Sequence, residues 1–194
     1  MKLLEEKILK DGTAIGTDIL KVDMFLNHQI DPVLIDEMGK EFYRLFKDCN
    51  ITKVVTIESS GISMAVATAR YFGVPALFAK KGDHKNVGSD VYSANCYSFT
   101  HGKEYCMKIS RKYLSSQDKV LIIDDFMAGG NACNALIDIM GQAGAEVMGI
   151  GIAIEKGFQP GGKTLREKGY KVRSLAIVDS MNDGEITFRQ DIDC

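Results

Sequence analysis

Two adjacent carboxylates and a run of small residues follow an apolar segment near the middle of the chain. The apolar segment is residues 120–123, and the acids are Asp124 and Asp125. The run before the next helical pattern consists of Ala128, Gly129, Gly130, Asn131 and Ala132. Ionised carboxylates suit the hydroxyls of a sugar diol, and a small-residue loop before a helix brings backbone N–H groups close to an anion. The segment therefore predicts a ribose 5-phosphate site at the carboxyl end of a strand.

This segment has other interpretations when it is taken alone. Paired aspartates after a strand also occur in phosphorelay receivers and in many metal sites, and a glycine pair before a helix can be an ordinary turn. Residues 120–132 contain neither the GxxxxGK[ST] spacing of a Walker loop nor the GxGxxG spacing of a dinucleotide site. Ribose-phosphate binding is favoured over these alternatives.

A second turn of small residues lies between another predicted strand and helix, and consists of Glu58, Ser59, Ser60 and Gly61. It can bind an anion, or it can be an ordinary helix cap formed by one of its serines. Lys80 and Lys81 follow the next strand, where lysines are most often solvated. Two anion-binding turns on parallel strands would suit one substrate that carries both a phosphate and a pyrophosphate.

A lysine and an aromatic residue follow a further apolar run. Lys156 can donate a hydrogen bond to a purine carbonyl oxygen and Phe158 can stack on the ring, although a lysine beside a turn explains the pattern equally well. In the N-terminal part, Leu20 has the character of a core residue and Asn27 that of a helix cap.

Short apolar runs alternate with helix-period stretches, which predicts an α/β fold with a mostly parallel sheet. The predicted strands are residues 52–57, 76–79, 120–123, 147–154 and 172–178. The predicted helices are residues 3–9, 32–46, 62–71 and a stretch around 133–140 whose apolar residues recur with helical spacing. Residues 91–98 and 105–110 could pair as a hairpin beside a polar connection at 81–95.

Composition excludes several classes of protein. The 194 residues carry a net charge of -2 with no long basic stripe, which disfavours nucleic-acid binding. We see no apolar run of the ~20 residues that span a membrane and no secretory leader, so we expect a cytoplasmic protein. Five cysteines without a CxxC pair, and His28, His84 and His101 without ligand spacing, indicate neither a disulfide framework nor a zinc site.

The stretch 120–132 resembles the PRPP-binding motif of type I phosphoribosyltransferases, where PRPP is 5-phosphoribosyl 1-pyrophosphate. In that family two acids follow four apolar residues and hold the ribose hydroxyls, and the loop and helix hold the 5-phosphate. The resemblance gives the first role to Asp124 and Asp125, which we take as the catalytic pair, and the second to Ala128, Gly129, Gly130, Asn131 and Ala132. Many members end this loop in Thr-Gly-x-Thr, whereas this chain has Ala-Gly-Gly-Asn-Ala, similar to the xanthine-specific branch.

The same resemblance covers nearly the whole chain and implies further binding residues. Glu58, Ser59, Ser60 and Gly61 match the family's pyrophosphate loop, which usually contains a strained peptide bond, and Lys81 matches a basic residue that reaches the pyrophosphate. The base-binding residues would be Leu20, Asn27, Lys156 and Phe158. The implied architecture is one domain over residues 1–194, with a hood at about 1–48 and 156–170, a core at about 50–155 and 171–180, and a flexible loop at about 81–110.

The implied activity is purine salvage by a glycosyltransferase that converts xanthine and PRPP to xanthosine 5'-monophosphate (XMP) and pyrophosphate. Mg²⁺ held through PRPP would be the cofactor, and a homodimer without nucleic-acid or membrane partners is expected. Two alternatives share the fold: a guanine or hypoxanthine phosphoribosyltransferase, and a non-catalytic regulator that senses PRPP. A third alternative is an α/β protein that binds phosphate with no sugar specificity.

Overall fold

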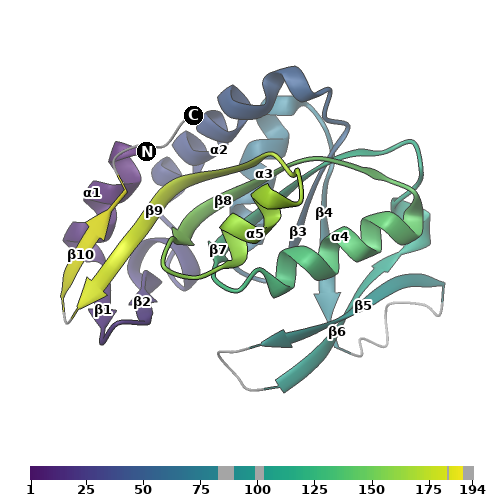
Figure 1. The fold of residues 1–194 in the computed structure, drawn as a ribbon. Helices are drawn as coiled ribbons and strands as arrows, with labels where there is room; N and C mark the ends of the chain where they lie inside the picture. Colours follow the sequence, from purple (N-terminus) through teal and green to yellow (C-terminus); the bar gives the residue numbers. More distant parts are fainter. Residues whose placement is uncertain (83–89, 99–102, 183, 190–194) are drawn as a thin grey trace.

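The structure of this chain is a computed structural model, which describes residues 1–82, 90–98, 103–182 and 184–189 (Figure 1). His84, His101 and Cys194 lie outside the described residues. So do residues 83–89 and 99–102 of the expected flexible loop.

An eight-stranded sheet with the order β10-β9-β8-β7-β3-β4-β6-β5 forms the centre of the molecule (Figure 1). The five strands β9, β8, β7, β3 and β4 run parallel, while β10 and the β5–β6 hairpin are antiparallel additions at the two edges. The strands are β3 (Lys53–Ile57), β4 (Ala76–Lys81), β5 (Val91–Ser98), β6 (Lys103–Ser110), β7 (Lys119–Met127), β8 (Glu146–Lys156), β9 (Val172–Asn182) and β10 (Glu185–Phe188). The α/β fold class predicted from the sequence is confirmed.

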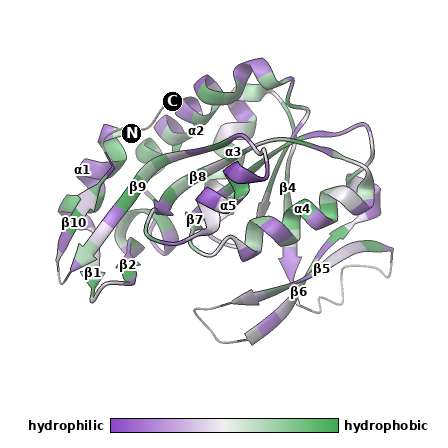
Figure 2. Ribbon diagram, viewed as in Figure 1, coloured by the Kyte–Doolittle hydropathy of each residue, from purple (hydrophilic) through white to green (hydrophobic). Residues whose placement is uncertain are grey.

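Helices cover both faces of the sheet and close two apolar cores. On one face, α2 (Pro32–Phe46) and α3 (Gly61–Phe72) pack in a core that contains Phe42, Phe46 and Met64. On the other face, α4 (Asn131–Ala143) and α5 (Gly161–Glu167) contribute Leu136, Met140 and Leu165. The central strands contain long apolar stretches, with charged residues near their ends (Figure 2). Such stretches are expected when both faces of a parallel sheet are buried.

Local signals in the sequence set the ends of these helices. Asp31 caps α2 by accepting hydrogen bonds from Val33 N and Leu34 N, and Pro32 takes the first helical position. Gly73 and Gly144 end α3 and α4 with φ of 67° and 72°, a left-handed conformation that glycine adopts without penalty. The helices 32–46, 62–71 and 133–140 predicted from the pattern therefore match α2, α3 and α4.

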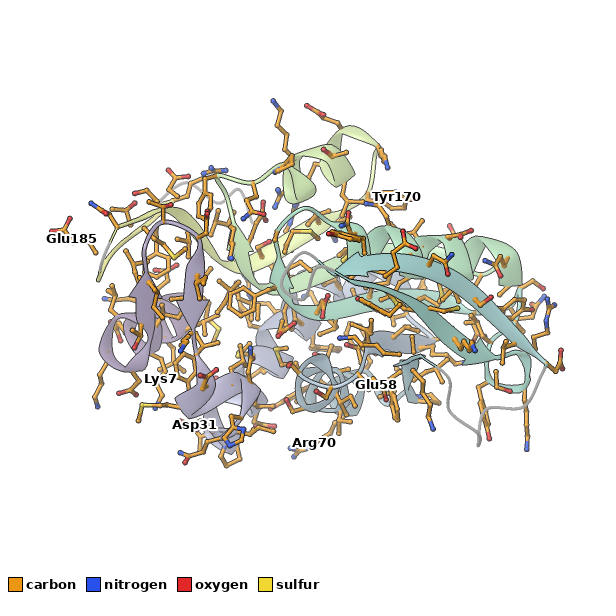
Figure 3. The ribbon with its side chains drawn as sticks, turned by 90° about the horizontal axis from the view of Figure 1, so that it is seen from below. Lys7, Asp31, Glu58, Arg70, Tyr170 and Glu185 are labelled. Carbon is orange, nitrogen blue, oxygen red and sulfur yellow. The ribbon has the colours of Figure 1, made fainter. Side chains whose placement is uncertain are left out.

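The N-terminal part of the chain packs beside β9 and β10. It consists of α1 (Lys2–Asp11), a hairpin of β1 (Thr13–Ile15) and β2 (Ile19–Lys21), and a π-helical turn (Asp23–Asn27). Lys7 forms ion pairs with Asp11 at 3.1 Å and with Asp31 at 3.2 Å, which ties α1 to the start of α2 (Figure 3). Within the described residues, no helix is both long and apolar enough to cross a bilayer.

The predicted and observed elements differ in two ways: several short elements were not predicted, and β7 and β9 run further than predicted, β9 to Asn182 rather than to residue 178. The β1–β2 hairpin, α5 and β10 were not predicted, because segments of three to seven residues contain too few positions to show a period. The strand predicted at 120–123 extends through the two aspartates to Met127, since Asp124, Phe126 and Met127 pair with residues of β8. The hairpin predicted at 91–98 and 105–110 is present as β5 and β6. Two short 3-10 turns, Lys47–Cys49 and Arg111–Tyr113, complete the described chain.

Candidate active site

A pocket of ≈ 210 Å³ lies where β7 ends. Its walls bring together Lys81 at the end of β4, the Asp124–Asp125 pair on β7 and the whole small-residue loop 128–132. The β5–β6 hairpin adds Cys96, Tyr97 and Tyr105 to the opposite wall. Residues predicted from separate stretches of sequence thus converge on one cavity, because the carboxyl ends of parallel strands share one edge of the sheet.

The two aspartates differ in their surroundings. Asp124 is 4% exposed and accepts a 3.0 Å hydrogen bond from Asp125 N, whereas the side chain of Asp125 is partly exposed. Burial, followed by the adjacent charge of Asp125, raises the pKa of Asp124 well above its usual value, and Lys81 opposes this shift. The pocket therefore contains two different acids: Asp124 is buried and holds a proton more readily than usual, whereas Asp125 is partly exposed.

The small-residue loop is fixed from several sides. Gly130 has φ of 83°, and its carbonyl accepts hydrogen bonds from Asn134 N at 2.9 Å and from Asn134 Nδ2 at 2.8 Å. The Ala128 carbonyl accepts from Gly161 N at 3.0 Å, so that the start of α5 packs on the loop. Asn131 Nδ2 donates to the Tyr97 carbonyl of β5 at 3.1 Å. The backbone at the start of α4 is thereby held in a fixed orientation above the aspartates.

The second turn of small residues, at 58–61, lies close to Asp124. The peptide bond between Glu58 and Ser59 is cis, and α3 begins at Gly61. A Cβ on Gly61 would overlap Thr56 Oγ1 and would lie 3.5 Å from Asp124 Oδ1, so only glycine fits there. Glu58 Oε1 accepts a 2.6 Å hydrogen bond from Lys81 N, which joins this turn to the end of β4. Glu58 lies well away from the N-terminal part in which Lys7 and Asp31 are labelled (Figure 3).

The four residues predicted to bind a base lie outside the walls of this pocket. Lys156, half-buried at the end of β8, donates a hydrogen bond to the Asp18 carbonyl in the β1–β2 turn, and burial lowers its pKa. Leu20 is buried in β2, Asn27 is exposed at the end of the π-helical turn, and Phe158 is 40% exposed. The structure thus brings Lys156 to the N-terminal hairpin that contains Leu20, and leaves Phe158 and Asn27 accessible to a ligand.

Sequence reasoning missed a buried carboxylate beside Lys156. Glu155 is 2% exposed and forms a bidentate ion pair with Arg166 of α5, with hydrogen bonds of 2.8 and 2.7 Å. Ser174 Oγ on β9 donates to the same carboxylate at 2.5 Å. An acidic residue at the end of an apolar strand was the only signal in the sequence, and its partners are 11 and 19 residues away. The hairpin residues Tyr105 and Cys96 were also missed as pocket walls.

A Walker-type spacing occurs elsewhere in the chain, at residues 157–164, but the structure does not form a phosphate loop there. Backbone N–H groups of this segment already donate within the protein: Gly157 to Val178 O, Gln159 to Lys156 O and Gly161 to Ala128 O. Lys163 lies at the surface and pairs with Glu167 at 3.8 Å. These donors serve to hold the turn after β8 rather than to surround an anion.

The described residues hold no group of three or more His, Cys, Asp or Glu side chains that could bind a metal ion by themselves. Asp124 and Asp125 are the carboxylates on the pocket wall. Such a site fits a metal that keeps most of its ligands from a bound phosphate compound, as Mg²⁺ commonly does.

Comparison with known proteins places this chain in a family. Residues 22–191 match the model of the phosphoribosyl transferase domain. The chain belongs to the phosphoribosyl transferase domain family. Similar structures include the adenine phosphoribosyl transferase of Trypanosoma brucei (TM-score 0.74, 18% identity, 90% of this chain and 78% of that one). The adenine phosphoribosyltransferase of Saccharomyces cerevisiae is another (TM-score 0.71, 20% identity, 90% and 99%). At such identities these two proteins show the fold alone.

Similar sequences belong to a narrower group of this phosphoribosyltransferase family. The chain is 56% identical to the xanthine phosphoribosyltransferase of Ruminiclostridium cellulolyticum, over 98% of this chain and 100% of that protein. It is 53% identical to the protein of that name in Clostridium novyi (97% and 100%). A third, from Acinetobacter baumannii, is 52% identical (97% and 98%). The resemblance to the type I phosphoribosyltransferases drawn from residues 120–132 is confirmed.

Proposed function

We propose that this phosphoribosyltransferase transfers the 5-phosphoribosyl group from PRPP to xanthine, giving XMP and pyrophosphate in purine salvage. The observation that carries the proposal is the convergence of the acid pair, the small-residue loop 128–132 and Lys81 on one pocket. The second turn, residues 58–61, does not line this pocket but approaches Asp124 at Gly61. Identities of 52–56% over nearly the full length with proteins named xanthine phosphoribosyltransferase support xanthine as the base.

Each part of the pocket receives one part of PRPP. Asp124 and Asp125 accept hydrogen bonds from the ribose hydroxyls, and residues 128–132 bind the 5-phosphate through backbone N–H groups and the start of α4. Glu58, Ser59, Ser60 and Gly61 form the pyrophosphate turn, with Lys81 at its side. None of these residues needs to act as a nucleophile. Their contribution is to hold the ribose for in-line attack by the base nitrogen and to neutralise the departing pyrophosphate.

In this proposal the base is recognised at the end of β8 and in the turn that follows it, together with two residues of the N-terminal part. In this proposal the Lys156 ammonium donates to the 6-oxo group, Phe158 stacks on the ring, and Leu20 and Asn27 complete the subsite from the N-terminal part. A cationic donor at this position disfavours adenine, whose 6-amino group is itself a donor. The contact between Lys156 and the Asp18 carbonyl supports this arrangement, because it brings the lysine to the hairpin that contains Leu20.

Mg²⁺ is the proposed cofactor; it would be held mainly through PRPP, and Asp124 and Asp125 are the carboxylates that the pocket wall offers it. The ion would neutralise charge on the pyrophosphate and orient it against the ribose. The proposed role of the two aspartates does not depend on Mg²⁺, because they bind the sugar hydroxyls directly.

The remaining features of the proposed enzyme follow from its family. We take residues 1–194 as one domain, with a hood at about 1–48 and 156–170 over a core at about 50–155 and 171–180. The flexible loop expected at residues 81–110 consists largely of the β5–β6 hairpin, which pairs with β4. In this proposal the hairpin and its connections close over the pocket and exclude water from the reacting ribose. A cytoplasmic homodimer is the proposed form of the protein.

An assay with four bases tests this function. Purified protein, PRPP and Mg²⁺ are incubated with xanthine, guanine, hypoxanthine or adenine, and nucleotide and pyrophosphate are measured. Preference for xanthine is the expected result. Turnover of another base would retain the assignment of Asp124, Asp125 and the loop but overturn the base, and tight PRPP binding without turnover would indicate a PRPP-sensing regulator.

A further inference from the structure

The side chain of Glu155 connects three elements at one buried point. It lies at the end of β8, directly before Lys156, and its carboxylate receives both guanidinium arms of Arg166 from α5 and the hydroxyl of Ser174 from β9. A bidentate contact fixes the orientation of the two groups as well as their separation. The position of α5 relative to the end of β8 is therefore set by this carboxylate.

The opposite end of α5 contacts the phosphate loop. Gly161 N donates to the Ala128 carbonyl, and a Cβ on Gly130 would lie 3.2 Å from Gly161 Cα. The next residue, Gly162, faces Glu155 so closely that a Cβ there would overlap Oε1 of the carboxylate. The helix thus lies between residues 128–130 on one side and Glu155 on the other, with glycines at both contacts.

We propose that Glu155 is a positioning residue that acts through Arg166 and α5 to fix the separation between the phosphate loop and the base-recognition turn at residues 156–158. A nucleoside monophosphate spans both sites, because its phosphate binds the loop and its base lies beside Lys156. This inference rests on the proposed function for the identity of that nucleotide. Glu155 itself contacts neither end of it, since its oxygens are occupied by Arg166 and Ser174.

The charges favour a rigid connection. Burial acts to raise the pKa of Glu155, but the hydrogen bonds from Arg166 and Ser174 outweigh burial and leave the pKa below its usual value. The carboxylate therefore stays ionised and holds Arg166 throughout the neutral range. Because Glu155 is neutralised by Arg166, it leaves the adjacent Lys156 ammonium available to the Asp18 carbonyl or to a base.

The test compares Glu155→Gln with Glu167→Gln, a matched control on the exposed face of α5 whose partner is Lys163. Calorimetric titration measures two Kd values. Ribose 5-phosphate uses the phosphate loop and the acid pair but not the base-recognition turn, whereas XMP uses all three. We expect Glu155→Gln to raise the Kd of XMP at least about tenfold, because small misplacements of a bound group are costly. The Kd of ribose 5-phosphate should change by less than about twofold. In the Glu167→Gln control, the Kd values of both ligands should match those of wild type.

A purely stabilising role of Glu155 predicts a different result. The variant would then lose thermal stability while folded protein kept the wild-type ratio of the two Kd values, and this outcome would overturn the proposal. If Glu155→Gln does not fold, Ser174→Ala removes a single hydrogen bond from the same carboxylate, and the same selective loss of XMP affinity is required of it.

The design separates this inference from the proposed function. If wild-type protein binds GMP or IMP in preference to XMP, the proposed base is wrong. The test of Glu155 then compares the Kd of the preferred nucleotide with that of ribose 5-phosphate. If wild-type protein binds no purine nucleotide more tightly than ribose 5-phosphate, both the base subsite and the role of Glu155 are overturned.

Discussion

Gly61 at the start of α3 packs closely against Thr56 and lies near Asp124, so that the turn at residues 58–61 and the acid pair are neighbours. A Cβ on Gly61 would overlap Thr56 Oγ1, which is buried and finds no hydrogen-bond partner among the described residues. Two parts of the proposed PRPP site therefore cannot move independently, and small changes at Gly61 are expected to reach the ribose site.

Gly61→Ala should raise the KM for PRPP by at least about tenfold, because the added methyl group displaces the turn. Gly141→Ala is the matched control, since a Cβ at Gly141 meets nothing within 4 Å. That control should raise the free energy of unfolding by about 0.5–1 kcal/mol through its helix propensity and leave KM unchanged. Equal KM values in the two variants would contradict the close contact between the turn and Asp124.

Asp124→Asn should separate stability from activity. Because burial raises the pKa of Asp124, the folded state binds more protons than the unfolded state between the usual aspartate value and the raised one. The free energy of unfolding of wild type therefore falls as pH rises through this window. We expect the amide variant to lack this fall and to have strongly reduced turnover, as measured by denaturant titration and by PRPP assay across pH. Normal turnover in Asp124→Ala and Asp125→Ala would refute the ribose assignment.

Asn134→Ala should weaken binding of the 5-phosphate. The Asn134 side chain holds the Gly130 carbonyl and, in turn, accepts a 3.1 Å hydrogen bond from Lys168. Loss of one such bond to a loop of this kind typically costs about 1 kcal/mol, so the Kd of ribose 5-phosphate should rise about fivefold. Lys168→Ala removes only the outer bond and should have a smaller effect. A larger effect for Lys168→Ala would indicate that the lysine binds the phosphate itself.

Lys156 should give the KM for xanthine a dependence on alkaline pH. Burial lowers the pKa of this lysine, so its ammonium loses a proton at lower pH than usual, and the KM for xanthine should then rise. Lys156→Arg keeps its charge over the whole range and should flatten the profile. Xanthine itself also titrates, but this affects wild type and Lys156→Arg equally, so it does not contribute to the difference between their pH profiles. Identical profiles would exclude a role for the Lys156 charge.

The parallel sheet and the acid–loop segment were predictable because both have local signals. Continuous apolar runs such as residues 120–123 indicate strands with two covered faces, and the glycines after Asp125 indicate an anion site. For the Glu155–Arg166–Ser174 cluster the only signal was an acid at the end of an apolar run, since its members are spread over β8, α5 and β9. The extension of β7 to Met127 was also hidden, because it depends on pairing with β8 rather than on the residues of β7.

The hydrogen bond between Lys156 and Asp18 joins positions 138 residues apart. Closing so long a loop has a large entropic cost, and contacts of this kind form late when a chain refolds. The loop at residues 128–132, by contrast, joins the consecutive elements β7 and α4, and its contacts with Tyr97 and Gly161 span far fewer residues. In a refolding experiment we therefore expect affinity for ribose 5-phosphate to return before affinity for the purine base, so that the chain passes through a sugar-binding state that cannot yet select its acceptor.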